Sequence, residues 1–146
     1  MMIDQQLVFD DGKAVAAAGA LTGTNVIDMG VARDLGSGEP LWVVLTFIGV
    51  VSGTTPSHIA ILKGADDVGI TSNVVVKYTS GALLLPAQAT AGVGVGQYAF
   101  RVPPGLPKRF YRLDGTAGGT TPAYVYSASI VKDVELKLHS RQLLGF

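Results

Sequence analysis

Few residues in this chain carry side chains that catalyse reactions or bind metals, and their spacing does not bring them together. The 146 residues include no cysteine, which excludes disulfides, thiolate metal ligands and cysteine nucleophiles. The two histidines, His58 and His139, are far apart in the sequence, whereas a metal site on a β-fold needs several imidazoles and carboxylates that converge. We therefore expect neither a metal nor any other cofactor.

Short motifs that resemble catalytic or nucleotide-binding sites are better explained as structure. Asp66 and Asp67 are adjacent, so in an extended chain their carboxylates point to opposite faces and do not share a substrate atom. His58 lies in an alternating segment with Ala60 on its face, which favours a hydrogen-bonded or surface histidine over a catalytic base. The Gly-Val-Gly-Val-Gly run at 92–96 leads into aromatic strand residues rather than a helix, unlike a phosphate-binding loop. We predict that the protein is not an enzyme.

The densest charged segment is Lys-Arg-Phe-Tyr-Arg, which begins at Lys108. On a strand, Lys108, Phe110 and Arg112 share one face. Arg109 and Tyr111 share the other. Cations interleaved with aromatic rings are typical of proteins that bind single-stranded nucleic acid. A nucleic-acid-binding domain normally carries net positive charge, however, and this chain is neutral with a pI near 6.7. An ordinary strand, or a protein interface in which arginines bind carboxylates of an acidic partner, is favoured over nucleic acid.

Charge is distributed unevenly although the net charge is zero. Residues 1–67 carry eight acidic and three basic side chains, and residues 68–113 carry five basic and no acidic ones. We expect these two parts to pair with each other, either between subunits or, as the favoured alternative, within one domain.

Composition and hydropathy predict one folded domain. Hydrophobic residues make up 48% of the chain and charged residues 15%, which is enough apolar surface to offset the entropy of folding. The longest apolar stretch, at 41–51, is about half of the roughly 20 residues that span a bilayer, so we expect no membrane segment. The N-terminus lacks the cationic start and apolar core of a signal peptide, which favours a cytoplasmic site of synthesis.

Most apolar segments have the length and composition of strands. They are rich in valine, isoleucine, tyrosine and threonine, and turn signals rich in glycine and proline separate them, notably at 52–56 and 114–119. This spacing predicts an all-β, single-domain jelly roll or β-sandwich. The predicted strands cover residues 41–48, 58–63, 73–78, 82–85, 97–102, 109–113, 123–131 and 131–138.

The N-terminal part is predicted to be an arm, residues 1–24, attached to a β-sandwich domain of residues 25–146. Its alanine-rich run at 13–21 fits a short helix, but Gly12 and Gly19 flank or interrupt this run, so an extended arm fits equally well. At the other end, the terminal Leu-Leu-Gly-Phe is expected to pack on the core or on a partner.

Several short motifs occur together along the chain. They are Leu-Val-Phe-Asp-Asp at 7–11, Ala-Val at 14–15, Thr-Asn-Val-Ile-Asp-Met-Gly at 24–30, Gly-Ser-Gly-Glu-Pro-Leu at 36–41, and Pro-Pro-Gly-Leu-Pro at 103–107 followed by Arg-Phe-Tyr. This set resembles the phage capsid cement (decoration) proteins of the Bordetella-phage type, small jelly-roll proteins on the heads of tailed phages. Met29 stands where leucine is usual in that family, which is a conservative exchange. The resemblance includes no catalytic residues.

The resemblance implies a non-enzymatic virion structural protein, made in the cytoplasm of a bacterial host, that lies on the capsid exterior and clamps neighbouring subunits of the major capsid protein. It also implies self-association, with a dimer favoured. We expect two adhesive surfaces, the arm and the basic strand. Their candidate residues are Leu7, Phe9, Val15, Lys108, Arg109, Phe110, Tyr111 and Arg112.

Two other functions stay open. A carbohydrate-binding β-sandwich needs exposed aromatic platforms, for which Tyr111, Tyr124 and Tyr126 are candidates. Trp42 lies in the most apolar segment and is expected in the core. A jelly-roll enzyme needs titratable residues that converge in one pocket, and the sequence offers few.

Overall fold

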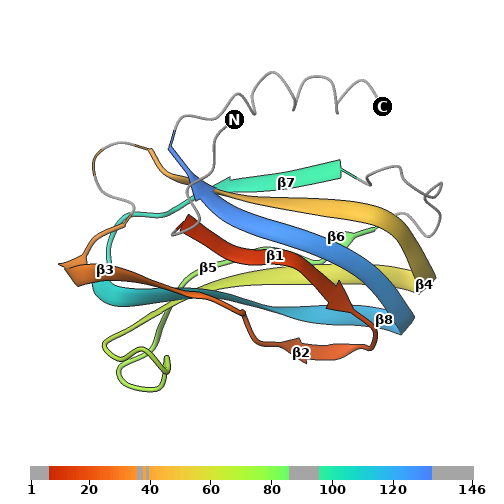
Figure 1. The fold of residues 1–146 in the computed structure, drawn as a ribbon, viewed down its shortest axis with the longest axis horizontal. Helices are drawn as coiled ribbons and strands as arrows, with labels where there is room; N and C mark the ends of the chain where they lie inside the picture. Colours follow the sequence, from red (N-terminus) through yellow and green to blue (C-terminus); the bar gives the residue numbers. More distant parts are fainter. Residues whose placement is uncertain (1–6, 36–37, 39, 86–95, 133–146) are drawn as a thin grey trace.

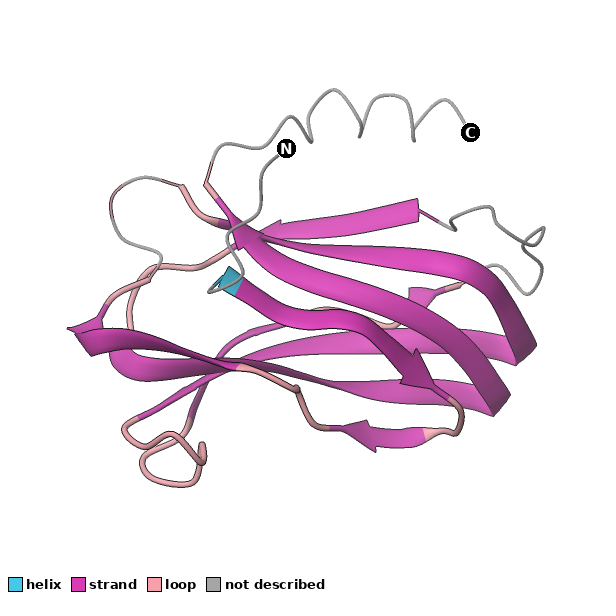
Figure 2. Cartoon of the chain, in the orientation of Figure 1, coloured by secondary structure: helices cyan, strands magenta, loops and turns pink. Residues whose placement is uncertain are grey.

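The computed structural model describes residues 7–35, 38, 40–85 and 96–132, and it contains no α-helix in these residues (Figure 1 and Figure 2). The abundant β-branched and aromatic residues account for this preference, because they fit the pleated surface of a sheet. The predicted all-β class is confirmed. The strands are β1 (Val8–Val15), β2 (Gly19–Leu21), β3 (Val26–Arg33), β4 (Trp42–Ala65), β5 (Val75–Thr79), β6 (Leu83–Leu84), β7 (Gly96–Arg101) and β8 (Lys108–Val131).

Strands β4 and β8, of 24 residues each, form one long antiparallel ribbon that bends back on itself. Trp42 lies opposite Val131 near one end, and Ala65 lies opposite Phe110 at the other. Register shifts between residues 48 and 57 mark the bend, where both strands curve round together in Figure 1. The ladder continues on both sides of the bend. The strand ends predicted at 52–56 and 114–119 are therefore wrong.

Glycines in the ribbon permit a close approach of the two backbones. A Cβ on Gly115 would lie 2.6 Å from the Ile59 carbonyl oxygen. Gly119 has a φ of 99°, and a Cβ there would lie 2.6 Å from the Thr55 carbonyl oxygen. In the sequence these glycines resemble turn signals. At Gly115, however, a glycine is required because the paired strands leave no room for a Cβ.

The shorter strands extend the two halves of the ribbon. In one half, β7 pairs with β4 and β1 pairs with β8; in the other, β5 and β6 pair with β4, and β2 and β3 pair with β8. The result is a single antiparallel sheet curled into a half-barrel, with both halves packed on one core. Fully buried side chains of this core include Phe9, Leu45, Leu62, Tyr111 and Tyr126.

The N-terminal segment forms strands on β8, so the helical alternative for residues 13–21 is wrong. On the side of β8 that does not face β4, the backbone N–H and C=O groups pair with β1 and β2. The positive φ angles of Gly12 (62°) and Gly19 (133°) are also incompatible with a helix. The chain is extended here, and it lies along its own domain, with Val15 opposite Tyr124. Residues 1–6, the predicted strand beyond residue 132 and the terminal Leu-Leu-Gly-Phe lie outside the described residues.

Candidate interaction surfaces

The cations at the start of β8 are bound to carboxylates of the same chain. Arg109 donates from Nε and Nη2 to the two oxygens of Asp28, at 2.8 and 2.9 Å, and Lys108 Nζ lies 3.0 Å from Asp66 Oδ1. Hydrogen bonds from Arg109 and the Gly30 N–H lower the pKa of Asp28 to about 2. These cations are compensated within the chain, so they do not form a free basic patch for an acidic partner.

Arg112 belongs to a second, less exposed ionic group. It donates to both oxygens of Asp114, at 2.6 and 2.8 Å, and Lys63 Nζ lies 3.0 Å from Asp114 Oδ2. Burial favours a raised pKa for Asp114, but hydrogen bonds from Arg112, the Gly23 N–H and Lys63 outweigh it, and the pKa lies below its ordinary value. The group fastens β8 to β4 and to the loop between β2 and β3.

The acidic and basic parts of the sequence pair within one domain, as the favoured alternative predicts. Three ion pairs connect residues 1–67 to residues 68–113. Each places a carboxylate of the first part within 3.5 Å of a cation of the second. The pairs are Asp28–Arg109, Asp34–Lys77 and Asp66–Lys108.

Three of the candidate interface residues are core residues. Phe9, Val15 and Tyr111 are 0%, 4% and 0% exposed. Removing these large side chains from water lowers the free energy of the folded protomer, so they face inward. A partner cannot reach them, and the expectation that they form an adhesive surface is corrected accordingly.

The other two apolar candidates reach the surface to different extents. Leu7 is 36% exposed, at the start of the described chain. Phe110 is half-buried, and the guanidinium of Arg109 lies 4.8 Å from the centre of its ring. Leu7 is therefore the candidate from the arm that is placed to touch a partner.

The tyrosines considered as sugar platforms lie in the core as well. Tyr124 and Tyr126 are buried like Tyr111, and burial raises the pKa of both hydroxyls above the ordinary value. The Tyr126 hydroxyl donates to Asp10 at 3.2 Å. A sugar needs an exposed ring face to stack on, which none of the three provides.

His58 lies in a buried aromatic cluster. Its Nδ1 is 2.8 Å from the Tyr124 hydroxyl, and the rings of Phe47 and Tyr126 pack around it. Burial lowers its pKa to about 4, so the ring is neutral at pH 7. The expectation of a hydrogen-bonded histidine is confirmed. Across the described ranges, no three histidine, aspartate or glutamate side chains gather to hold a metal ion.

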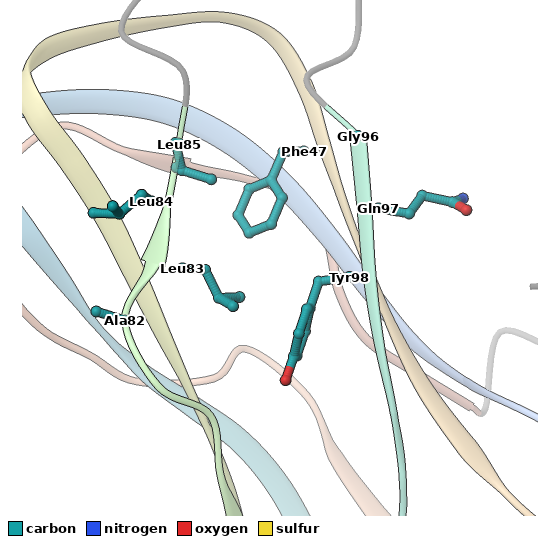
Figure 3. A pocket seen from close by; sticks show the side chains of 8 residues that line it. All are labelled: Phe47, Ala82, Leu83, Leu84, Leu85, Gly96, Gln97 and Tyr98. Atoms are coloured by element: carbon teal, nitrogen blue, oxygen red, sulfur yellow. The ribbon is translucent and has the colours of Figure 1, made fainter. Parts of the chain in front are cut away.

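A hollow of about 400 Å³ opens between β6 and β7 (Figure 3). The rings of Phe47 and Tyr98 and the side chain of Leu83 border it, whereas the Gln97 amide points away. The Tyr98 hydroxyl lies 2.8 Å from that of Tyr78, and burial, aided by this contact, raises the pKa of Tyr98 to about 12. The hollow suits an apolar group. Its lining carries no charge and consists of Phe47, Ala82, Leu83, Leu84, Leu85, Gly96, Gln97 and Tyr98.

Several large apolar side chains are exposed, and the sequence pattern singled out only Leu7 among them. Leu84 is 77% exposed although it lies within an apolar run of three leucines, and only its outward direction on β6 distinguishes it. Leu106 is 54% exposed in the loop between β7 and β8. No helix in the described part of the chain is long and apolar enough to cross a membrane. The full set is Leu7, Val31, Ile48, Val68, Val74, Val76, Leu84 and Leu106.

One family of known proteins matches most of this sequence. The sequence profile of Bbp16 matches residues 9–130, more than four fifths of the chain. The matched range runs from β1 almost to the end of β8 and so includes both halves of the curled sheet. The family name is formed like that of a Bordetella-phage protein. No curated protein sequence matches the chain.

Proposed function

The chain belongs to the Bbp16 family, and on this premise we propose that it is a non-enzymatic structural protein of a tailed-phage virion. It binds the capsid exterior and cements neighbouring subunits of the major capsid protein, as a homo-oligomer in which a dimer is favoured. It is made in the cytoplasm of the bacterial host. The observation that carries this proposal is the match over residues 9–130 to a family with a phage-type name.

The motifs that resemble cement proteins build the frame of this fold, which supports the proposal. In the run at 24–30, Ile27 is buried in the core and Asp28 binds Arg109 across β3 and β8. In the run at 103–107, the Gly105 N–H donates to Asp34. The resemblance therefore involves residues that determine the architecture. The bent β4–β8 ribbon also supports the jelly-roll arrangement, which is part of this proposal.

A cement protein needs a rigid body and contacts that are repeated over the shell. The long ribbon and the ion pairs within the domain supply rigidity. Each copy needs only modest contacts, because two sites on one dimer raise the effective concentration of the second contact once the first has formed. Because the cations of residues 108–112 are compensated within the chain, adhesion in this proposal depends on the exposed apolar side chains.

Binding to isolated phage heads tests the proposal. Heads that lack the protein, from the phage that encodes it, are mixed with the purified chain and sedimented. We expect saturable co-sedimentation and a higher temperature of shell disruption. Heads already carrying the protein are the control and should take up no more. Heads that remain bare at high protein concentration contradict the proposal.

A further inference from the structure

One four-residue sequence occurs twice in the chain, once in each long strand. Gly-Thr-Thr-Pro occupies residues 53–56 of β4 and residues 119–122 of β8, a shift of 66 positions. The two tetrapeptides meet at the bend of the β4–β8 ribbon, where Thr54 lies opposite Thr120. Their glycines have φ angles of 106° and 99°, and their second threonines have φ angles of 48° and 47°. The repeat is therefore one of conformation as well as of sequence.

The same shift relates the two long strands over their whole length. Moved by 66 residues, the bounds of β4 become those of β8. We call residues that are related in this way counterparts. Six buried residues of β4 have buried counterparts in β8, so each long strand contributes the same face to the core although the residue types differ. The pairs are Leu45–Tyr111, Phe47–Leu113, Val51–Ala117, His58–Tyr124, Ala60–Tyr126 and Leu62–Ala128.

The short strands β1 and β5 correspond as well. Val8 of β1 lies opposite Ser129, and Val76 of β5 lies opposite Lys63, which is the counterpart of Ser129. In both cases the next paired residue is two positions on in the short strand and one position back in the long strand. Both pairings therefore contain a bulge at the same place. A shared irregularity marks the correspondence more clearly than a regular ladder does.

Strands β3 and β7 complete the correspondence. Ile27 of β3 lies opposite Tyr111, and Tyr98 of β7 lies opposite Leu45, the counterpart of Tyr111. The end of β1 and strand β6 also pair with residues that are counterparts of each other. Among the described residues, only β2 has no counterpart strand. The strands thus follow one another in the same order in both parts of the chain.

A two-fold axis relates the two parts, which are residues 8–65 (the first copy) and 75–131 (the second copy). A residue can contact its own counterpart only near such an axis. The threonines that face each other at the bend are one such pair. His58 and Tyr124 are another, since Nδ1 of the histidine lies 2.8 Å from the tyrosine hydroxyl. The axis therefore passes through the bend and the aromatic cluster beneath it.

The two copies are intertwined. In the described part of the chain, each strand pairing joins a strand of the first copy to a strand of the second. Strands β1, β2 and β3 pair with β8, strands β5, β6 and β7 pair with β4, and the two long strands pair with each other (Figure 1). The sheet therefore forms only when both copies are present.

We propose that the chain is a fused two-fold dimer, in which two tandem copies of one β-unit associate as two separate chains would. Exchange of identical elements about a two-fold axis is a common way for two chains to form a dimer. The peptide link between the copies, within residues 66–74, is then dispensable. Asp67 in this segment accepts hydrogen bonds from the N–H groups of Thr71 and Ser72, which belong to the same segment. This arrangement does not depend on the proposed function.

Cutting the link in the folded full-length chain tests the proposal. A recognition sequence for a site-specific protease is inserted between Val68 and Gly69, which are both exposed. We expect the cut protein to keep the mass and the circular dichroism spectrum of the uncut variant, and to regain both after unfolding in urea and dilution. Its urea midpoint should rise with protein concentration more steeply than that of the uncut variant, because two chains must then associate. The uncut variant is the matched control.

A second variant tests whether the order of the copies matters. It joins Phe146 directly to Met1 and opens the chain between Val68 and Gly69, so that every residue is kept and the second copy comes first. Because β1 pairs with the end of β8, the joined segments leave from neighbouring strands. We expect the reordered chain to have the circular dichroism spectrum of wild type and to unfold cooperatively.

Each of the following results would overturn the proposal. An uncut insertion variant that does not fold shows that the connection is part of the fold. Cut pieces that do not reassemble, while the uncut variant refolds, show that the copies do not associate as separate chains. Equal concentration dependence of the two urea midpoints shows that one piece holds the fold alone. A reordered chain that does not fold shows that the copies are not equivalent. Failure of the wild-type chain to bind heads would count only against the proposed function.

Discussion

The guanidinium of Arg109 on β8 and the carboxylate of Asp28 on β3 meet in a two-point contact of 2.8 and 2.9 Å. This contact joins the basic middle of the chain to its acidic beginning. It also compensates the charge that makes residues 108–112 look like a binding site in the sequence. A partner therefore meets a strand whose charges are already paired, and adhesion depends on other surfaces.

Replacement of Asp28 by asparagine should release the charge of Arg109. We expect D28N to be retained longer than wild type on immobilised heparin, and the difference to vanish near 1 M salt, where screening reaches within about 3 Å. D11N is the matched control, because Asp11 is exposed and its replacement changes the net charge equally. Equal retention of D28N and D11N contradicts the assigned role of the pair.

The close approach of the two long strands makes Gly115 intolerant of a side chain. A Cβ there would lie 2.6 Å from the Ile59 carbonyl oxygen and 3.1 Å from His58 Cε1. We expect G115A to lower the free energy of unfolding in urea by about 3 kcal/mol. G81A is the control, since nothing lies within 4 Å of a Cβ on Gly81, and its stability should change by less than about 0.5 kcal/mol. A G115A variant as stable as G81A contradicts the packing described for the ribbon.

The β-branched and aromatic composition of the apolar segments predicted residues of β4 to β8 as strand, because such side chains fit a pleated sheet. Strands β1 to β3 were not predicted, and Trp42, which was expected in the core, is only half-buried. The continuity of β8 through Gly115 could not be predicted. A glycine that gives room to a neighbouring backbone looks the same in a sequence as one that makes a turn. The role of Arg109 also depends on a carboxylate 81 residues earlier, which only the fold brings near.

Acid should weaken the fold through His58. The pKa of His58 is about 4 in the folded protein, compared with an ordinary value of 6.5. Between pH 6.5 and pH 4, the unfolded chain therefore binds a proton at His58 that the folded chain does not bind. The stabilisation is complete above pH 6.5 and is lost as the pH falls to about 4, by about 3 kcal/mol in total.

The measurement is the free energy of unfolding at about pH 7.5 and about pH 4.5 for wild type and H58N. The asparagine does not titrate, so we expect the acid-induced loss in H58N to be smaller by about 2 kcal/mol. Other titrating groups are common to both proteins and cancel in the comparison. Equal losses contradict a buried neutral His58.

The carboxylate of Asp34 should stabilise the fold by compensating the buried ammonium of Lys77. D34N leaves this ammonium, which is 1% exposed, without that negative charge, and we expect the free energy of unfolding to fall by about 3 kcal/mol. The double variant K77M/D34N removes both charges and should recover part of the loss. Urea denaturation with an unchanged m-value measures the effect. A double variant less stable than D34N contradicts a role for charge pairing.

Electron cryomicroscopy of phage heads with and without the protein is the most direct test of the proposed cement role. We predict additional density on the outer surface, of the size of this 15.1 kDa chain or its dimer, that contacts two neighbouring capsid subunits. Density confined to one capsid subunit, or no additional density, contradicts the proposal that the protein cements the shell.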